Sequence, residues 1–271
     1  MRRLIVNADD FGRSHSINAA VIRAHRDGIL TTASLMVNEV ACAEAVKLAK
    51  ENPRLGVGLH LALVCGTSAL SQEIIPGLVD AQKQFTNNPV AAGFRYFFSA
   101  PLKEQLRLEI AAQFAKFHAT GLRLDHVNGH LNIHLHPVIF DILMENAEQW
   151  GIKHLRLTRD SFRENANLAS GQWGYRLSHA FIYRLLSQRS KPLLARKKIR
   201  HTDRVFGLLQ NARVDEEFIL KLLPQLPAGD SELYSHPSLD EFKHELDALI
   251  SPRVKALVRQ DEIELIRYQD L

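Results

Sequence analysis

The chain alternates between short apolar runs and stretches in which apolar residues recur at helical spacing. A brief apolar run predicts a buried strand, and apolar residues three or four positions apart predict a helix. Strands are predicted over residues 3–8, 31–37, 55–63, 122–127, 154–158, 205–209, 232–235 and 263–268. Helices are predicted over residues 17–28, 41–51, 102–118, 138–150 and, within the less regular stretch 160–200, around residues 178–187. Residues 64–101 show neither pattern, and loops this long in a compact domain are usually functional.

Strands and helices that alternate through short connections pair in parallel. Seven or eight such units over 271 residues predict an α/β fold, an irregular (β/α) barrel that is TIM-like with mostly parallel strands. An open doubly wound sheet is the alternative, but the first strand is followed by Asp-Asp-Phe-Gly and not by a glycine-rich phosphate loop. Without a linker, repeat or low-complexity tract, residues 1–271 are expected to form a single domain.

Composition is ordinary for a globular protein, with 46% hydrophobic and 24% charged residues. No apolar run approaches the roughly 18–20 residues that span a bilayer, and the first apolar run is too short for a signal-peptide core. We therefore expect a cytoplasmic protein. The two cysteines, Cys42 and Cys65, are far apart in sequence and are expected to be small apolar fillers.

The net charge of +4 is mild, but residues 189–204 are dense in lysine and arginine. This segment is either a solvated face or a patch for an anionic surface, membrane or phosphate. Nucleic acid is not expected as a partner, because no aromatic residues interleave with these charges and no nucleic-acid-binding motif is present.

Polar side chains that can bind a metal gather where the predicted strands end. In an α/β barrel the active site forms at the carboxyl ends of the strands. The candidate residues at these ends are Asp9, Asp10, His60, His130 and His236. Further histidines follow the strand over residues 122–127. There His126 is expected to pack, while His134 and His136 either support the site or begin the next helix.

Two adjacent carboxylates at the end of a buried strand repel each other unless a cation or a shared proton compensates. In extended backbone Asp9 and Asp10 point to opposite faces, so one could bind a metal while the other faces the reacting water. Alternatively, one of them caps the next helix. One carboxylate and two imidazoles suit Zn²⁺, Mn²⁺ or Co²⁺, and suit Mg²⁺ less well.

The histidines have simpler alternatives. His60 alone could be a satisfied core residue, and His130 follows the turn signal Asn128-Gly129, which places it on a loop past a strand end. His236 precedes a proline and is either a turn residue or a general acid across the site from the metal.

Four motifs in order carry a resemblance: NADDFG, GLHL, a segment of the form G-H-x-x-x-H-x-x-P, and SHP. Together they resemble the YdjC-like carbohydrate deacetylases over nearly the whole chain. The resemblance implies an irregular barrel, commonly a homodimer, that removes acetyl groups from N-acetylated sugars. It implies one divalent metal ion (Zn, Mg, Mn or Co) held by Asp10, His60 and His130, with no other cofactor.

The same resemblance implies that Asp9 is the general base and His236 the acid. Members often carry a second histidine two positions after the last ligand, where this chain has Asn132. The departure puts any role of that position toward substrate or metal in doubt.

Within this family, the segments DHVNGHLNIHLHP and LYSHPS most resemble the hopanoid-biosynthesis-associated deacetylases. That branch implies an N-acetylglucosaminyl lipid as substrate, and it would give the basic segment 189–204 a role in peripheral contact with the anionic inner membrane surface. The alternatives are a metal-dependent phosphoesterase on a similar barrel and a non-catalytic sugar-lipid binding protein.

Overall fold

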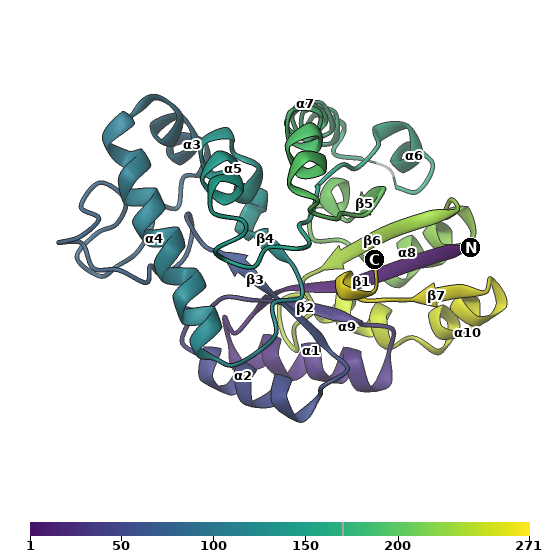
Figure 1. Ribbon diagram of the computed structural model, residues 1–271. Coiled ribbons are helices and arrows are strands. Elements are labelled where there is room, and N and C mark those ends of the chain that lie inside the picture. Colours follow the sequence, from purple (N-terminus) through teal and green to yellow (C-terminus); the bar gives the residue numbers. More distant parts are fainter. Residues whose placement is uncertain (170) are drawn as a thin grey trace.

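In the computed structural model, which describes residues 1–169 and 171–271, the strands form one parallel sheet curled into a half-barrel (Figure 1). The strands are β1 (Arg2–Phe11), β2 (Thr32–Leu35), β3 (Gly56–Leu61), β4 (Val127–Gly129), β5 (Arg204–Phe206), β6 (Gly229–Ser235) and β7 (Ile263–Leu265). Their order is β4-β3-β2-β1-β6-β5, and β7 also pairs with β1. The predicted α/β class with a barrel-like parallel sheet is confirmed.

Strand β1 lies at the centre of this sheet and is buried from Leu4 to Phe11. One of its edges pairs with β6 in continuous register from Arg2↔Gly229 to Ala8↔Ser235. The other edge is shared, because β7 pairs with the first half of β1 and β2 with the second. Both halves of the chain therefore meet at β1.

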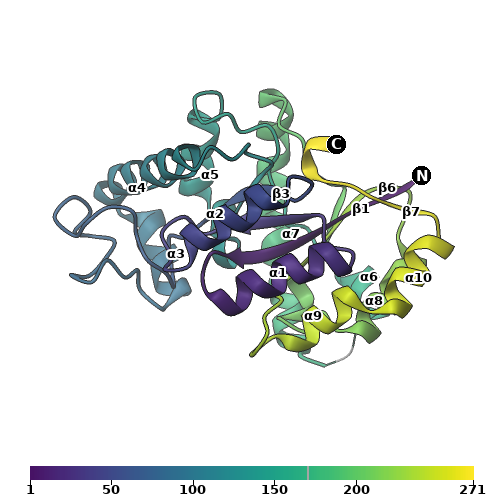
Figure 2. The ribbon, with the colours of Figure 1, turned by 90° about the horizontal axis from the view of Figure 1, so that it is seen from below.

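Helices surround the half-barrel, with α1 and α2 on the opposite side from α3, α5 and α7 (Figures 1 and 2). The helices are α1 (His15–Asp27), α2 (Cys42–Glu51), α3 (Pro89–Phe98), α4 (Ala100–Ala119), α5 (Pro137–Glu145), α6 (Phe162–Ala166), α7 (Trp173–Lys197), α8 (Glu216–Leu222), α9 (Lys243–Ile250) and α10 (Pro252–Gln260). Short 3₁₀ turns are η1 (His130–Leu135), η2 (Leu208–Gln210), η3 (Leu223–Gln225) and η4 (Tyr268–Asp270).

Local sequence explains where several helices begin and end. Ser14 caps α1 by accepting a hydrogen bond from the Ile17 N–H at 3.2 Å, and Asp215 caps α8 from the Phe218 N–H at 2.8 Å. Helix α1 stops at Gly28, whose Cα faces the backbone of Leu249 at the end of α9. These residues fix where α1 and α8 begin and where α1 ends.

Residues 153–159 lie between β4 and β5 without forming a full strand. The N–H of Arg156 donates to the Val127 carbonyl in β4, and the N–H of Leu155 donates to the Arg200 carbonyl. The strand predicted over residues 154–158 is therefore present only as isolated parallel bridges. This segment extends the curl of the sheet beyond β4 toward β5.

Other predictions needed correction. The strand predicted over residues 122–127 is displaced, because ladder hydrogen bonds to β3 begin only at the Asp125 N–H and β4 itself covers Val127–Gly129. The irregular stretch 64–101 contains α3, and the helix predicted around residues 178–187 lies inside the much longer α7. No described helix is long and apolar enough to cross a bilayer.

Candidate metal centre in an open cleft

The carboxyl end of β1 departs from regular strand geometry at the two aspartates. Asp10 has a left-handed backbone, with φ of +63°, and the register between β1 and β2 shifts between Ala8 and Phe11. Asp is among the few residue types that adopt this conformation with modest strain. The expectation that Asp9 and Asp10 point to opposite faces is wrong, because this bulge turns both side chains into the same cleft.

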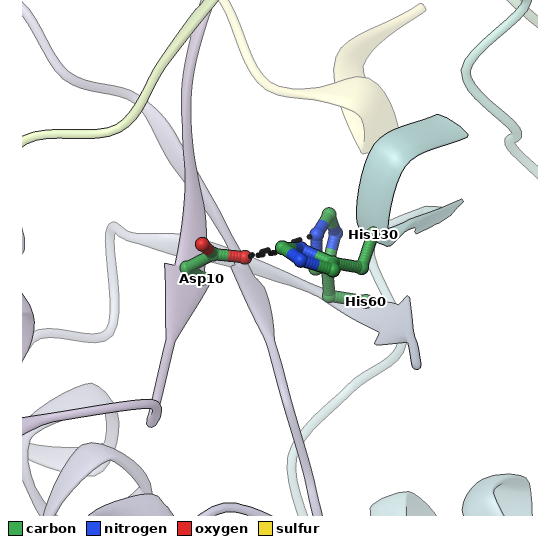
Figure 3. Close-up of side chains that lie close together, drawn as sticks. All are labelled: Asp10, His60 and His130. Atoms are coloured by element: carbon green, nitrogen blue, oxygen red, sulfur yellow. Dashed lines mark hydrogen bonds and ion pairs between the residues drawn. The ribbon is translucent and has the colours of Figure 1, made fainter. Parts of the chain in front are cut away.

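Asp10, His60 and His130 converge from β1, β3 and the start of η1 (Figure 3). One carboxylate oxygen of Asp10, Oδ1, lies 3.3 Å from His60 Nε2 and 3.0 Å from His130 Nδ1. All three side chains are buried, and one ligand atom from each lies within 4.8 Å of the others. This donor set and spacing suit a divalent transition-metal ion with room for further ligands.

Neighbouring groups hold these three side chains in place. The Nδ1 atom of His60 bonds to the Asn128 side-chain oxygen at 2.7 Å, which leaves Nε2 free to face Asp10. The second carboxylate oxygen of Asp10 accepts from Arg13 at 2.9 Å. Burial raises the pKa of Asp10, but the charges and hydrogen bonds of His130 and His60 outweigh it and hold the pKa well below its usual value.

Asp9 is held by a buried arginine that sequence reasoning missed. Arg156 donates two hydrogen bonds to the Asp9 carboxylate, at 2.7 Å to Oδ2 and 2.9 Å to Oδ1. Oδ1 also accepts from Asn7 at 2.8 Å and lies 3.3 Å from the Asn128 amide. Burial raises the pKa of Asp9, but the guanidinium charge outweighs it, so that the pKa lies below its usual value and the group is ionised at neutral pH.

His236 faces Asp9 from the end of β6. Its Nε2 lies 4.0 Å from Asp9 Oδ2, and its Nδ1 lies 3.9 Å from the carboxylate of Glu245. The backbone N–H of His236 also donates to Glu245, which is fully buried. Glu245 thus fixes the turn that carries His236 and lies beside its ring.

These groups border a cleft of about 1190 Å³. Asp9, Asp10, His130 and His236 all line it, whereas His60 lies beneath. Helices α3 and α7 supply much of its outer wall, including Val90, Ile182 and Tyr183. The structure therefore brings all five sequence-predicted site residues to one place, four in the cleft wall and the fifth in contact with Asp10.

Below the cleft, the interior of the half-barrel is a network of polar side chains. The Ser34 hydroxyl lies 3.0 Å from the Asn7 amide and 2.9 Å from His126 Nε2, and it accepts from Asn128 at 2.8 Å. Arg156 also pairs with Glu232 at 2.8 Å. This network fixes the groups that hold Asp9 and His60.

The other histidines lie outside the metal group. His126 is buried between Ser34 and Asp125 and stacks on Tyr268 at 4.4 Å, in agreement with the packing role expected for it. His134 Nε2 bonds to the Arg156 carbonyl at 2.9 Å, and burial lowers the pKa of His134 to about 3. His136 bonds to the Gly93 carbonyl at 3.0 Å at the cleft wall.

Asn132, the position that departs from the resembled pattern, lies in the cleft wall with a left-handed backbone. Its side-chain oxygen accepts from the Thr158 hydroxyl at 2.7 Å, and its amide lies 3.4 Å from the Tyr234 hydroxyl. The side chain of Asn132 therefore makes its polar contacts with neighbouring residues, Thr158 and Tyr234.

Comparison with known proteins shows relatives along the full chain. The family described as YdjC-like protein matches residues 3–260. A carbohydrate deacetylase of Brevibacillus brevis is 43% identical over 150 residues, which span 55% of this chain and 57% of that relative, just over half of each. A carbohydrate deacetylase of Clostridium beijerinckii is 28% identical over an alignment of 284 positions covering 99% of this chain and 100% of the relative.

Among solved structures, a protein from Enterococcus faecalis named for cellobiose-phosphate cleavage superposes with a TM-score of 0.74 at 23% identity. The superposition covers 99% of this chain and 98% of that one, and it shows a shared fold. The family match spans nearly the whole chain, and so this chain belongs to the YdjC-like protein family.

Proposed function

We propose that this protein is a metal-dependent hydrolase that removes the N-acetyl group from an N-acetylated amino sugar. The observation that carries the proposal is the placement of Asp9 and His236 beside the group formed by Asp10, His60 and His130 in one open cleft. The relatives named carbohydrate deacetylases support the same chemistry.

Asp10, His60 and His130 would hold the metal, with His60 presenting Nε2 and His130 presenting Nδ1. A divalent ion at such a site supplies Lewis-acid polarisation of a carbonyl and acidifies water. The donor set favours Zn²⁺, Mn²⁺ or Co²⁺ over Mg²⁺, because two of the three ligands are nitrogen.

Asp9 would accept the proton of the attacking water. Its Oδ1 is saturated by Arg156, Asn7 and Asn128, whereas Oδ2 has Arg156 as its single donor among the described residues and keeps a lone pair available. Arg156 orients the carboxylate and keeps it charged, and so Arg156 is a positioning residue. His236, across from Oδ2, would protonate the departing amine, which an amide requires because an unprotonated amine anion is too basic to leave.

Two kinds of substrate would suit the cleft. A free amino sugar would be bound by its polar lining, whereas an amino-sugar lipid, such as an N-acetylglucosaminyl hopanoid, would also use apolar wall residues such as Ile17, Leu131 and Leu186. The presence of these apolar side chains in the cleft wall favours the lipid as the finer proposal.

Acetate release tests the reaction class. N-acetylglucosamine, chitooligosaccharides and an N-acetylglucosaminyl lipid would be assayed before chelation, after chelation and after a divalent ion is restored. Release that chelation abolishes and metal restores would support the proposal. No release from any of these compounds by metal-loaded protein would overturn it.

The alternatives predict different observations. Phosphoesterases of this kind usually hold two metals with more carboxylates, and the residues that the structure describes contain one group with metal-ligand spacing. Binding of about two ions per chain would therefore favour phosphoester chemistry. A purely sugar-binding protein needs neither an acid nor a base, so it leaves Asp9 and His236 without a role.

A further inference from the structure

The outer faces of α3 and α7 carry large apolar side chains in contact with solvent. We name as the apolar rim Phe94, Phe97 and Phe98 on α3 and Trp173, Phe181 and Leu185 on α7. Phe98 is 76% exposed and Phe181 63% exposed. Scattered exposed apolar residues are ordinary, but clusters of large ones on neighbouring elements mark an interaction surface.

The apolar rim continues into the cleft. Val90 on α3 and Ile182 on α7 both line the cleft and are 67% and 48% exposed, so each joins the cleft wall to the outer surface. Helix α5 packs against both α3 and α7, which stand on either side of it (Figure 1). An amphiphile bound at the rim would therefore lie next to the cleft mouth.

The charged side chains of α3 and α7, apart from histidine, are all basic. Helix α7 contains six arginine or lysine residues and no acidic residue, and α3 contains Arg95 and no acidic residue. Arg184 and Lys191 are exposed and follow Trp173 and Phe181 at helical spacing, so they share the apolar face of α7. Apolar anchors interleaved with basic residues are typical of surfaces that lie on anionic membranes.

We propose that the apolar rim docks on an anionic lipid bilayer and presents the cleft mouth to the headgroups of its lipids. The aromatic side chains would enter the interface, while Arg184 and Lys191 would extend to lipid phosphates. The identity of the headgroup that enters the cleft rests on the proposed function, but the docking itself does not.

A second copy of the chain fits this surface less well. Isologous packing of α7 on its own copy, about an axis between Arg184 and Lys191, would bring Arg184 of one copy near Lys191 of the other, and like charges at an interface are unfavourable. The basic segment 189–204 is not one surface either, since Arg189 pairs with Asp141 and Arg204 with Glu164. Of this segment the docking face includes Lys191, and its other residues on α7 lie in the earlier turns of that helix.

Vesicle sedimentation of the full chain tests docking without turnover. The probes are vesicles of phosphatidylcholine alone and of phosphatidylcholine with one-quarter phosphatidylglycerol. The double variant Phe98→Ser, Phe181→Ser is expected to reduce partition to the anionic vesicles by about tenfold or more. Its matched control is Val40→Ser, Ile74→Ser, which changes two exposed apolar residues elsewhere and should bind like the unmodified protein.

Charge is tested in the same assay. Arg184→Gln with Lys191→Gln should weaken partition by about fivefold per charge at low salt, and the difference should shrink as salt screens it. Lys47→Gln with Lys50→Gln on α2 is the control, because α2 lies on the opposite side of the molecule (Figure 1).

Three outcomes would overturn docking: no binding of the unmodified protein to anionic vesicles, rim variants that bind like their controls, or a dimer that the rim variants convert to monomer. The dimer result would make the rim an interface between copies. Vesicle binding that depends on the rim, together with no acetate release from any sugar, would leave docking standing while the proposed chemistry fails.

Discussion

Asp10 has a left-handed backbone and is also one of the three candidate metal ligands. Its carboxylate contacts both His60 and His130. We expect Asp10→Ala, His60→Ala and His130→Ala each to lower metal affinity by more than about 100-fold, because losing even a partner of a ligand costs about 10–100-fold. Titration with Zn²⁺ or Co²⁺ followed by elemental analysis measures this.

His15→Ala is the control for these variants, because His15 is an exposed histidine paired with Glu44 on α2. A variant of Asp10, His60 or His130 that still bound one ion per chain with unchanged affinity would remove that residue from the metal group.

Asp9→Asn tests the role of Asp9 as the base without removing a metal ligand. Asparagine keeps an oxygen for Arg156 but cannot take a proton, so we expect kcat to fall by about 10²-fold or more with the metal retained. Arg156 keeps its pair with Glu232, which limits the loss of stability. Acetate release and metal content measure the two effects. Asp240→Asn, at the cleft wall, is the control, and full activity of Asp9→Asn would exclude Asp9 as the base.

Asp160 makes stability depend on pH. Burial raises the pKa of its carboxyl to about 7, against hydrogen bonds from the Leu209 N–H and the Asn165 side chain. Because the folded protein keeps this proton and the unfolded chain loses it near the ordinary value of 3.8, the contribution to stability is present in acid and is lost as pH rises through about 7.

The free energy of unfolding of the unmodified protein, minus that of Asp160→Asn, should therefore fall between pH 4 and pH 7. The slope is about 1.4 kcal/mol per pH unit at most. Urea unfolding of the two proteins at several pH values measures the difference. A difference that rises with pH would show that Asp160 is ionised in the folded state.

At the scale of elements, much of the sheet was predictable because its strands show short apolar runs and, in several of them, polar and apolar residues that alternate along the strand. In β1 the polar Asn7 and Asp9 alternate with the apolar Val6 and Ala8, and such period-two alternation marks a strand with one polar face. The same alternation places Asn7 and Asp9, Thr32 and Ser34, and His126 and Asn128 in the interior network. Taken together, these alternations were a signal that the interior of the barrel is polar.

Sequence could not show which partners meet across that interior. Arg156 reads as an ordinary strand residue, and its pairing with Asp9 depends on the curl that brings residues 153–159 opposite β1. The bulge at Asp10 was equally hidden, because aspartate tolerates a left-handed backbone without requiring it. Candidate residues were therefore predictable, whereas the groups that orient them were not.

The contact between α1 and α9 gives a prediction about packing. A Cβ atom at Gly28 would lie 2.3 Å from the Leu249 carbonyl oxygen, which belongs to the backbone and cannot move alone. We expect Gly28→Ala to lower the free energy of unfolding by about 1–3 kcal/mol. Gly174→Ala in α7 meets nothing within 4 Å and should be neutral or slightly stabilising. Equal stability of the two variants in urea unfolding would contradict the predicted clash.

At the scale of the whole molecule, residues near the end of the sequence support the cleft from below. The Tyr268 hydroxyl donates to Glu232, Glu232 pairs with Arg156, and Arg156 holds Asp9. Because all four side chains are buried, we expect a change at Tyr268 to affect the cleft through this chain of charged hydrogen bonds.

Tyr268→Phe should cost about 1.5–3 kcal/mol of stability, the range for a hydrogen bond to a charged group. Tyr96→Phe, which removes a buried hydrogen bond to the neutral Leu63 carbonyl, should cost about 0.5–1.5 kcal/mol. Thermal and urea unfolding measure both. A smaller loss at Tyr268 than at Tyr96 would show that the bond to Glu232 contributes little.

The central position of β1 has a consequence for synthesis on the ribosome. Both strands that flank its first half, β6 and β7, begin at Gly229 or later, so β1 emerges long before these two neighbours exist. At about 5–20 residues per second, translation leaves this apolar strand edge unpaired for on the order of ten seconds or more. An unpaired edge of that kind readily joins other chains. The nascent protein should therefore depend on chaperones that shield its first strand until the last quarter of the chain has been made.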